Sequence, residues 1–120
     1  MNLVLSLILS LIIVLHLYFI WLEMFAWTTH GKKVFKGIPD DFFVQSKAMA
    51  ANQGLYNGFL VAGLLWSFFI GDPVWSEKVA IFFLSCISIA GIYGAITASR
   101  SIFFVQGLPA ILAIILLVFK

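Results

Sequence analysis

The sequence predicts an all-α integral membrane protein, a four-helix bundle with both termini on the non-cytoplasmic side. Of its 120 residues, 63% are hydrophobic and only 10% are charged, a composition far from that of a soluble domain. Four stretches of 22, 24, 21 and 19 residues contain no charged side chain. Each stretch is long enough to cross a bilayer, which takes about 20 apolar residues. We therefore expect a single transmembrane domain over residues 1–120, with helices at about 3–27, 45–70, 76–99 and 102–119.

The first helix could be mistaken for a secretory signal peptide. No Lys or Arg precedes its apolar run, and the run continues into Trp21, Phe25 and Trp27 instead of a small-residue cleavage site. We expect it to stay in the mature protein.

The connections between the helices follow from turn-forming and charged residues. Residues 28–43 contain glycines, lysines, a proline and two aspartates, which predicts the main loop. The second helix ends before Gly71-Asp72-Pro73, because proline does not continue a helix. The third and fourth helices are joined by the few residues around Arg100, so they should be antiparallel neighbours.

Orientation follows from the distribution of Lys and Arg. Five of these residues fall in the connections after the first and third helices, and two lie on the other side. The side richer in Lys and Arg is normally cytoplasmic. We expect a multi-pass protein of the cell membrane with both ends outside.

Polar side chains inside the bilayer are costly and usually face a bundle interior or a wet cavity. Ten of them fall in the predicted cytoplasmic half, on shared helix faces: His16, Glu23, Asn52, Gln53, Tyr56, Asn57, Tyr93, Thr97, Arg100 and Gln106. On the second helix the opposite side carries small residues, Gly54 and Gly58 among them. The outer halves offer only serines. This pattern predicts a cytoplasm-facing polar pocket, closed by an apolar plug, that binds a small-molecule or lipid ligand.

Each candidate also has a structural interpretation. The amides of the second helix can join helices by hydrogen bonds. Glu23 and Arg100 can form a structural ion pair, and His16 can be a hydrogen-bonded core residue.

Other classes find little support in the sequence. The net charge of +2 and the lack of a dense basic patch argue against nucleic acid. The single cysteine, Cys86, excludes an internal disulfide and a cysteine-rich metal site. We expect no metal, and the sequence identifies no cofactor.

The small residues on the second and third helices suggest close packing, and we expect a homo-oligomer in the lipid bilayer.

Four motifs together resemble a family of small four-helix bacterial integral membrane proteins, a family known only as a domain of unknown function. They are His16, Tyr18, Phe19, Glu23, Met24, Phe25 and Trp27 in the first helix, the run Asn52-Gln53-Gly54-Leu55-Tyr56-Asn57-Gly58, Gly91 with Tyr93-Gly94, and Gln106-Gly107 with Pro109. The resemblance covers nearly the whole chain and implies no activity.

The chain also has a distant architectural similarity to the membrane-associated eicosanoid and glutathione metabolism (MAPEG) proteins. The resemblance implies four-helix trimers with outward termini and a thiol-ligand site between subunits. Lys47-Ala48 matches the start of their second-helix motif, but Asn52 falls one residue late and no Glu occupies this helix. A thiol-transferase-like enzyme, a small exporter and a structural membrane partner protein are the alternatives to ligand binding, and whether the protein is an enzyme stays open.

Overall fold

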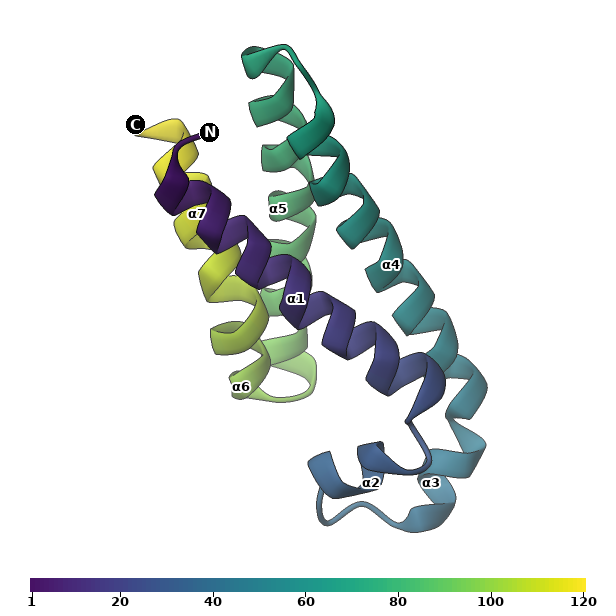
Figure 1. Ribbon diagram of the computed structural model, residues 1–120. Coiled ribbons are helices and arrows are strands. Elements are labelled where there is room, and N and C mark those ends of the chain that lie inside the picture. The colour runs from purple at the N-terminus through teal and green to yellow at the C-terminus, as the bar shows by residue number, and fades with distance from the viewer. The chain divides into compact units, whose positions relative to one another are not determined.

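The computed structural model describes all residues, Met1–Lys120, and is all-α, as the sequence predicts. Its elements are α1 (Leu3–Phe25), α2 (His30–Val34), α3 (Asp40–Gln45), α4 (Lys47–Phe69), α5 (Pro73–Thr97), α6 (Arg100–Ile102), the π-helix η1 (Phe103–Gly107) and α7 (Leu108–Val118) (Figure 1). No strand is present.

Three helical stretches are long and apolar enough to cross a membrane. They are α1, α5 and the continuous stretch Arg100–Val118. Helix α4 has the same length as α1, 23 residues, but it is not among them. Its first half contains Asn52, Gln53 and Asn57, which make it more polar than the other three. The fourth crossing therefore stays a prediction.

The first connection contains more helix than we expected. Helix α1 ends at Phe25 instead of about residue 27, and α2 and α3 occupy much of the predicted loop. Pro39 directly precedes α3, and Asp40 and Asp41 occupy its first turn. Carboxylates in a first turn are favourable because the helix dipole is positive there.

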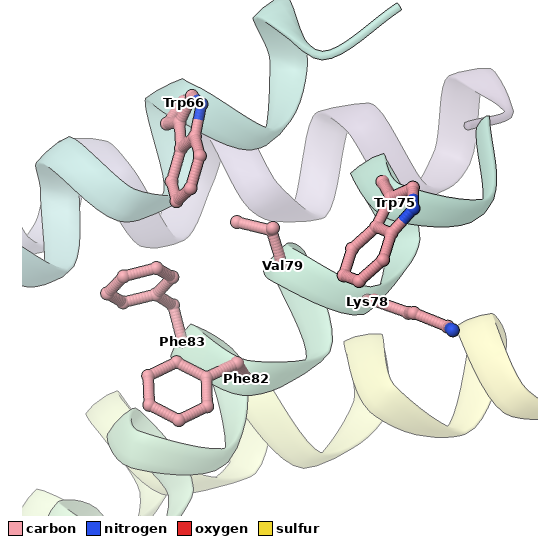
Figure 2. Close-up of a pocket in the computed structure, with 6 residues that line it drawn as sticks. All are labelled: Trp66, Trp75, Lys78, Val79, Phe82 and Phe83. Atoms are coloured by element: carbon pink, nitrogen blue, oxygen red, sulfur yellow. The ribbon is translucent and has the colours of Figure 1, made fainter. Parts of the chain in front are cut away.

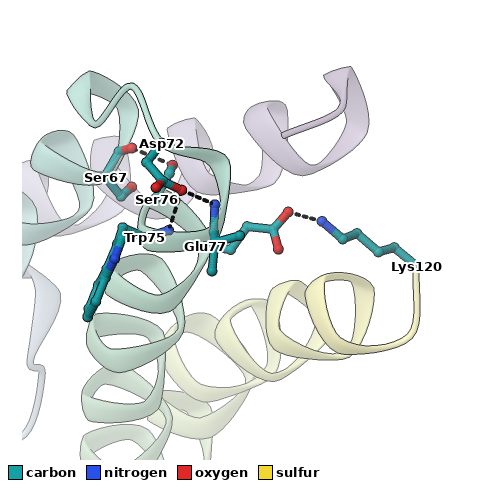
Figure 3. A network of polar contacts seen from close by, with 7 residues as sticks. Ser67, Asp72, Trp75, Ser76, Glu77 and Lys120 are labelled. Atoms are coloured by element: carbon teal, nitrogen blue, oxygen red, sulfur yellow. Dashed lines mark hydrogen bonds and ion pairs between the residues drawn. The ribbon is translucent and has the colours of Figure 1, made fainter.

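Helix α5 begins at Pro73, three residues before the predicted start. Asp72 caps it, since Oδ1 of Asp72 accepts hydrogen bonds from the backbone N–H groups of Val74 at 2.8 Å and Trp75 at 3.3 Å. The Ser76 hydroxyl donates to the Ser67 carbonyl at 2.6 Å, which ties the start of α5 to the end of α4 (Figure 3). The α4–α5 turn is thus held by its own polar groups.

The chain forms two compact units, which we describe separately. The first unit comprises Met1–Ile13 and Ala62–Lys120. Leu9, Leu64, Leu84 and Ile87 are fully buried in it. Lys120, at the end of the chain, pairs with Glu77 near the start of α5 (Figure 3), so α5 and α7 are antiparallel. The two chain ends lie at the same end of this unit (Figure 1).

A glycine pair brings α5 and η1 of the first unit into close contact. A Cβ atom on Gly91 would lie 2.6 Å from both the Cα and the N atom of Gly107. Real Cβ atoms do not approach backbone this closely, so only glycine fits at Gly91 without moving the helices apart.

The second unit, Val14–Val61, contains the end of α1, the short helices α2 and α3, and α4 as far as Val61. Phe43 is completely buried, and its ring lies 5.3 Å from that of Trp27. The Trp27 indole donates to the Ser46 hydroxyl at 2.9 Å. These contacts fold the connection after α1 back onto the start of α4.

Candidate functional site

Glu23 is the one charged residue in α1, and it lies two residues before the end of that helix. The residue is only 9% exposed. The Asn57 amide, on α4, donates a hydrogen bond of 2.7 Å to Oε1 of Glu23. The structure therefore brings two of the predicted site residues, Glu23 and Asn57, into direct contact.

Gly54 makes this contact possible by allowing α4 close to α1. A Cβ atom on Gly54 would lie 2.6 Å from Cγ of Met24 and 3.2 Å from Cβ of Glu23. Gly54 and Asn57 thus both face α1. Asn57, three residues after Gly54, lies at the edge of the predicted polar side of α4, where it reaches Glu23.

The other three predicted site residues of α4 are exposed. Asn52, Gln53 and Tyr56 all lie at the surface of the chain, and Tyr56 is 67% exposed. An exposed amide or phenol on a helix in a membrane needs a hydrogen-bonding partner, because hydrocarbon offers none. This polar face lies directly beside the Glu23–Asn57 hydrogen bond.

His16 is almost fully buried on α1, with 2% exposure, and its ring makes an edge contact with Phe19 at 5.3 Å. It precedes Glu23 by two turns, roughly 10 Å along the helix.

The remaining four predicted residues belong to the first unit. Tyr93, Thr97 and Arg100 are exposed, and the Thr97 hydroxyl donates to the backbone carbonyl of Tyr93 at 2.8 Å. Gln106 is half-buried in η1. Because Glu23 and Arg100 lie in different units, their ion pair and the ten-residue pocket remain predictions.

One aromatic cluster in the second unit was not predicted. The Tyr18 hydroxyl is 3.0 Å from Nε2 of His30, and the Trp21 ring lies 5.3 Å from the His30 ring. The spacing of Tyr18 and Trp21, three residues apart on one helix face, was the available signal. The position of His30 depends on the turn after α1, which helical periodicity does not predict.

The first unit contains a groove between α4 and α5 that the sequence did not predict. Trp66 of α4 and five residues of α5 line a cavity of about 350 Å³ (Figure 2). The α5 residues are Trp75, Lys78, Val79, Phe82 and Phe83. The Lys78 ammonium group lies 4.9 Å from the centre of the Trp75 ring. No group of three His, Cys, Asp or Glu side chains is placed to hold a metal ion.

These features define the class of the protein. It is a small all-α protein with three helices suited to a membrane, and one of them, α1, carries a carboxyl group that is hydrogen-bonded to α4. The chain belongs to the family described as protein of unknown function (DUF1304), whose model matches residues 10–118. The predicted resemblance to a family of unknown function is thereby confirmed. The chain is similar to the uncharacterized protein YpaA of Lactococcus lactis subsp. lactis (strain IL1403), with 31% identity over 115 residues, 93% of this chain and 95% of the relative. No solved structure matches the chain.

Proposed function

We propose that this protein crosses the cell membrane four times, with α4 as the fourth crossing, and binds a small amphiphilic molecule at Glu23. The ligand carries a hydrogen-bond donor, such as an ammonium or hydroxyl group, on an apolar chain. We further propose that the protein acts as a homo-oligomer, with the polar face of α4 on the cytoplasmic side.

The observation that carries the proposal is the Glu23–Asn57 hydrogen bond within an otherwise uncharged helix. Ionisable side chains within membrane helices are rare and usually functional. A carboxylate has two oxygens that accept about four hydrogen bonds, and the amide of Asn57 uses only part of that capacity. The exposed amide of Asn52 and the Tyr56 hydroxyl supply further polar groups beside it.

A purely structural role is the competing function, and the Gly54 contact favours it. The close approach of α4 to Met24 shows that this helix crossing is tightly packed. If Glu23 only joins the helices, removing either partner leaves a buried polar group unsatisfied, at a cost of about 1–3 kcal/mol.

Melting curves of the purified protein in mild detergent distinguish the two roles. We would compare decylamine, decanol and decanoate, which share one chain and differ in their head groups. Ligand binding raises the melting temperature by mass action. We expect decylamine and decanol to raise it in the wild type, and decanoate to have no effect because its head group is an acceptor at neutral pH.

Variants locate the effect. Glu23→Gln should remove the shift caused by decylamine, and Asn57→Ala should weaken it. Ser10→Ala, on the same helix, is the matched control, since the Ser10 hydroxyl bonds only to the carbonyl of Ser6 in its own helix. A large loss of stability in both site variants, with the decylamine shift unchanged, would establish the structural role and refute ligand binding.

A further inference from the structure

We propose that the groove between α4 and α5 is a binding site for an anionic phospholipid, with an acyl chain along its aromatic wall and the phosphate group at Lys78. The site is separate from Glu23 and does not depend on the function proposed there. Figure 2 shows Trp66 facing the α5 side chains across the groove.

The shape of the groove is fixed by a glycine contact. A Cβ atom on Gly63 of α4 would lie 2.3 Å from an atom of the Phe83 ring. The ring therefore occupies the space beside the glycine and forms a wall where α4 and α5 meet. Ser76 and Ser67 hold the same two helices together near the turn. The groove is thus formed within the chain and does not need its occupant to create it.

The lining suits an acyl chain. Apart from Lys78, every lining residue is aromatic or aliphatic. Trp66, Trp75 and Phe82 are each more than half exposed, so the groove opens to the surroundings of α5, a helix suited to crossing a membrane. Hydrocarbon is the solvent of such a surface.

The charge at one end selects the head group. Lys78 is exposed and lies five residues after Pro73, the first residue of α5. It is thus roughly 8 Å along the helix from the N-terminus of α5. Glu77, the neighbouring carboxylate, already pairs with Lys120. Lys78 contacts the face of Trp75 and pairs with no carboxylate. Lysines near helix ends extend toward the head groups, and tryptophans favour the same level. An unpaired ammonium group there complements a lipid phosphate with net negative charge.

The test uses the full chain in mild detergent and native mass spectrometry to count bound lipids. Dioleoyl phosphatidylglycerol and dioleoyl phosphatidylcholine have the same acyl chains and differ in net charge. We expect the wild type to retain phosphatidylglycerol about fivefold more strongly than phosphatidylcholine, the factor expected for one basic residue near an anionic surface.

Lys78→Gln should reduce this retention ratio to about one. Lys33→Gln, in the second unit, is the charge-matched control and should leave it unchanged. Free glycerol phosphate should not compete, because it has no chain for the groove.

Two further variants test the wall. Val79→Trp, which fills the groove, and Phe82→Ala, which removes an exposed wall ring, should lower retention of both lipids. Circular dichroism verifies that each variant is helical. If Val79→Trp does not fold, Phe82→Ala alone tests the wall of the groove. Equal retention of the two lipids by the wild type, or an unchanged ratio in Lys78→Gln, would overturn the proposal. So would a protein dimer that Val79→Trp dissociates without any change in bound lipid, since the groove would then hold a second copy.

Discussion

Glycines in this chain differ sharply in what surrounds them. Gly54, Gly63 and Gly91 each lie against another helix so closely that a Cβ atom would be within 2.6 Å of a neighbouring atom. Gly58, in contrast, has its nearest neighbour, Cδ1 of Ile20, at 4.0 Å. The sequence indicated close packing at small residues, and the three tight contacts are all made within one chain. They therefore give no support to the expected homo-oligomer, which stays a prediction.

Gly91→Ala should destabilise the protein because the added methyl group meets the backbone of Gly107, which cannot rotate away as a side chain can. We expect a loss of about 1–3 kcal/mol, typical of overpacking, in spite of the higher helix propensity of alanine. Reversible unfolding in mixed micelles, followed by circular dichroism, measures the change.

Gly58→Ala is the matched control for this prediction. It makes the same substitution inside a long helix with open space around it, so it should be neutral or stabilising by up to about 1 kcal/mol. An equal loss in both variants would mean that the close contact at Gly91 does not determine its effect.

The place of Glu23 near the end of the first helix could be predicted from the sequence, and its partner could not. A lone acidic residue after 22 uncharged residues already indicated a polar position near a membrane boundary. Asn57 lies 34 residues away, and three other polar side chains of α4 were equally plausible from helical periodicity. The choice depends on which side of α4 faces α1, and the contact at Gly54 decides this. Exposure of Tyr93 and Thr97 likewise depends on packing, which the helical pattern leaves open.

At the scale of the elements, helix ends depend on local capping chemistry. The start of α5 was predicted three residues late, although Asp72 followed by Pro73 is a recognisable cap with proline in the first turn. Helices α2 and α3 are too short to show a hydrophobic period. Phe43 of α3 is completely buried and its ring packs beside that of Trp27, a tertiary contact that the sequence pattern does not reveal.

Asp72→Ala should remove both hydrogen bonds to the N-terminal amides of α5. We expect a loss of about 0.5–2 kcal/mol in the free energy of unfolding, the usual cost of losing a helix cap. Asp72→Asn should keep most of the stability, because asparagine is an equally good cap. Thermal unfolding in detergent compares the three proteins, and full stability in Asp72→Ala would contradict a capping role.

The π-helix η1 has two identifiable causes. Pro109 lies in the first turn of α7 and has no N–H group to donate to a carbonyl one turn earlier. Gly107 must also lie against Gly91. A single π-helical turn accommodates both requirements inside an otherwise continuous helix. The sequence predicted the helix across residues 102–119 but gave no sign of this irregularity, because periodicity over such a short stretch cannot distinguish the two helix types.

For the whole molecule, the number of crossings and the side of the termini are linked. Three helices are apolar enough to span a membrane by themselves, and three crossings would place the chain ends on opposite sides. The two ends lie together at one end of the first unit (Figure 1), which favours an even number. Helix α4 is long enough to supply the fourth crossing, since 23 residues at 1.5 Å extend about 35 Å.

Single cysteines placed at Asn2, Lys36 and Lys120, each in a Cys86→Ser background, test this arrangement with a membrane-impermeant thiol reagent. All three positions are exposed. In intact cells we expect labelling at positions 2 and 120 and none at 36, because the connection containing Lys36 belongs to the side with five of the seven Lys and Arg residues. Permeabilised cells should label all three.

Labelling only at position 36 in intact cells would show that the orientation is the opposite of the predicted one. Lys78 and its groove would then lie in the cytoplasmic leaflet. Different behaviour of positions 2 and 120 would mean an odd number of crossings, and α4 would then lie outside the membrane with its polar face in water, where Asn52 and Tyr56 need no ligand.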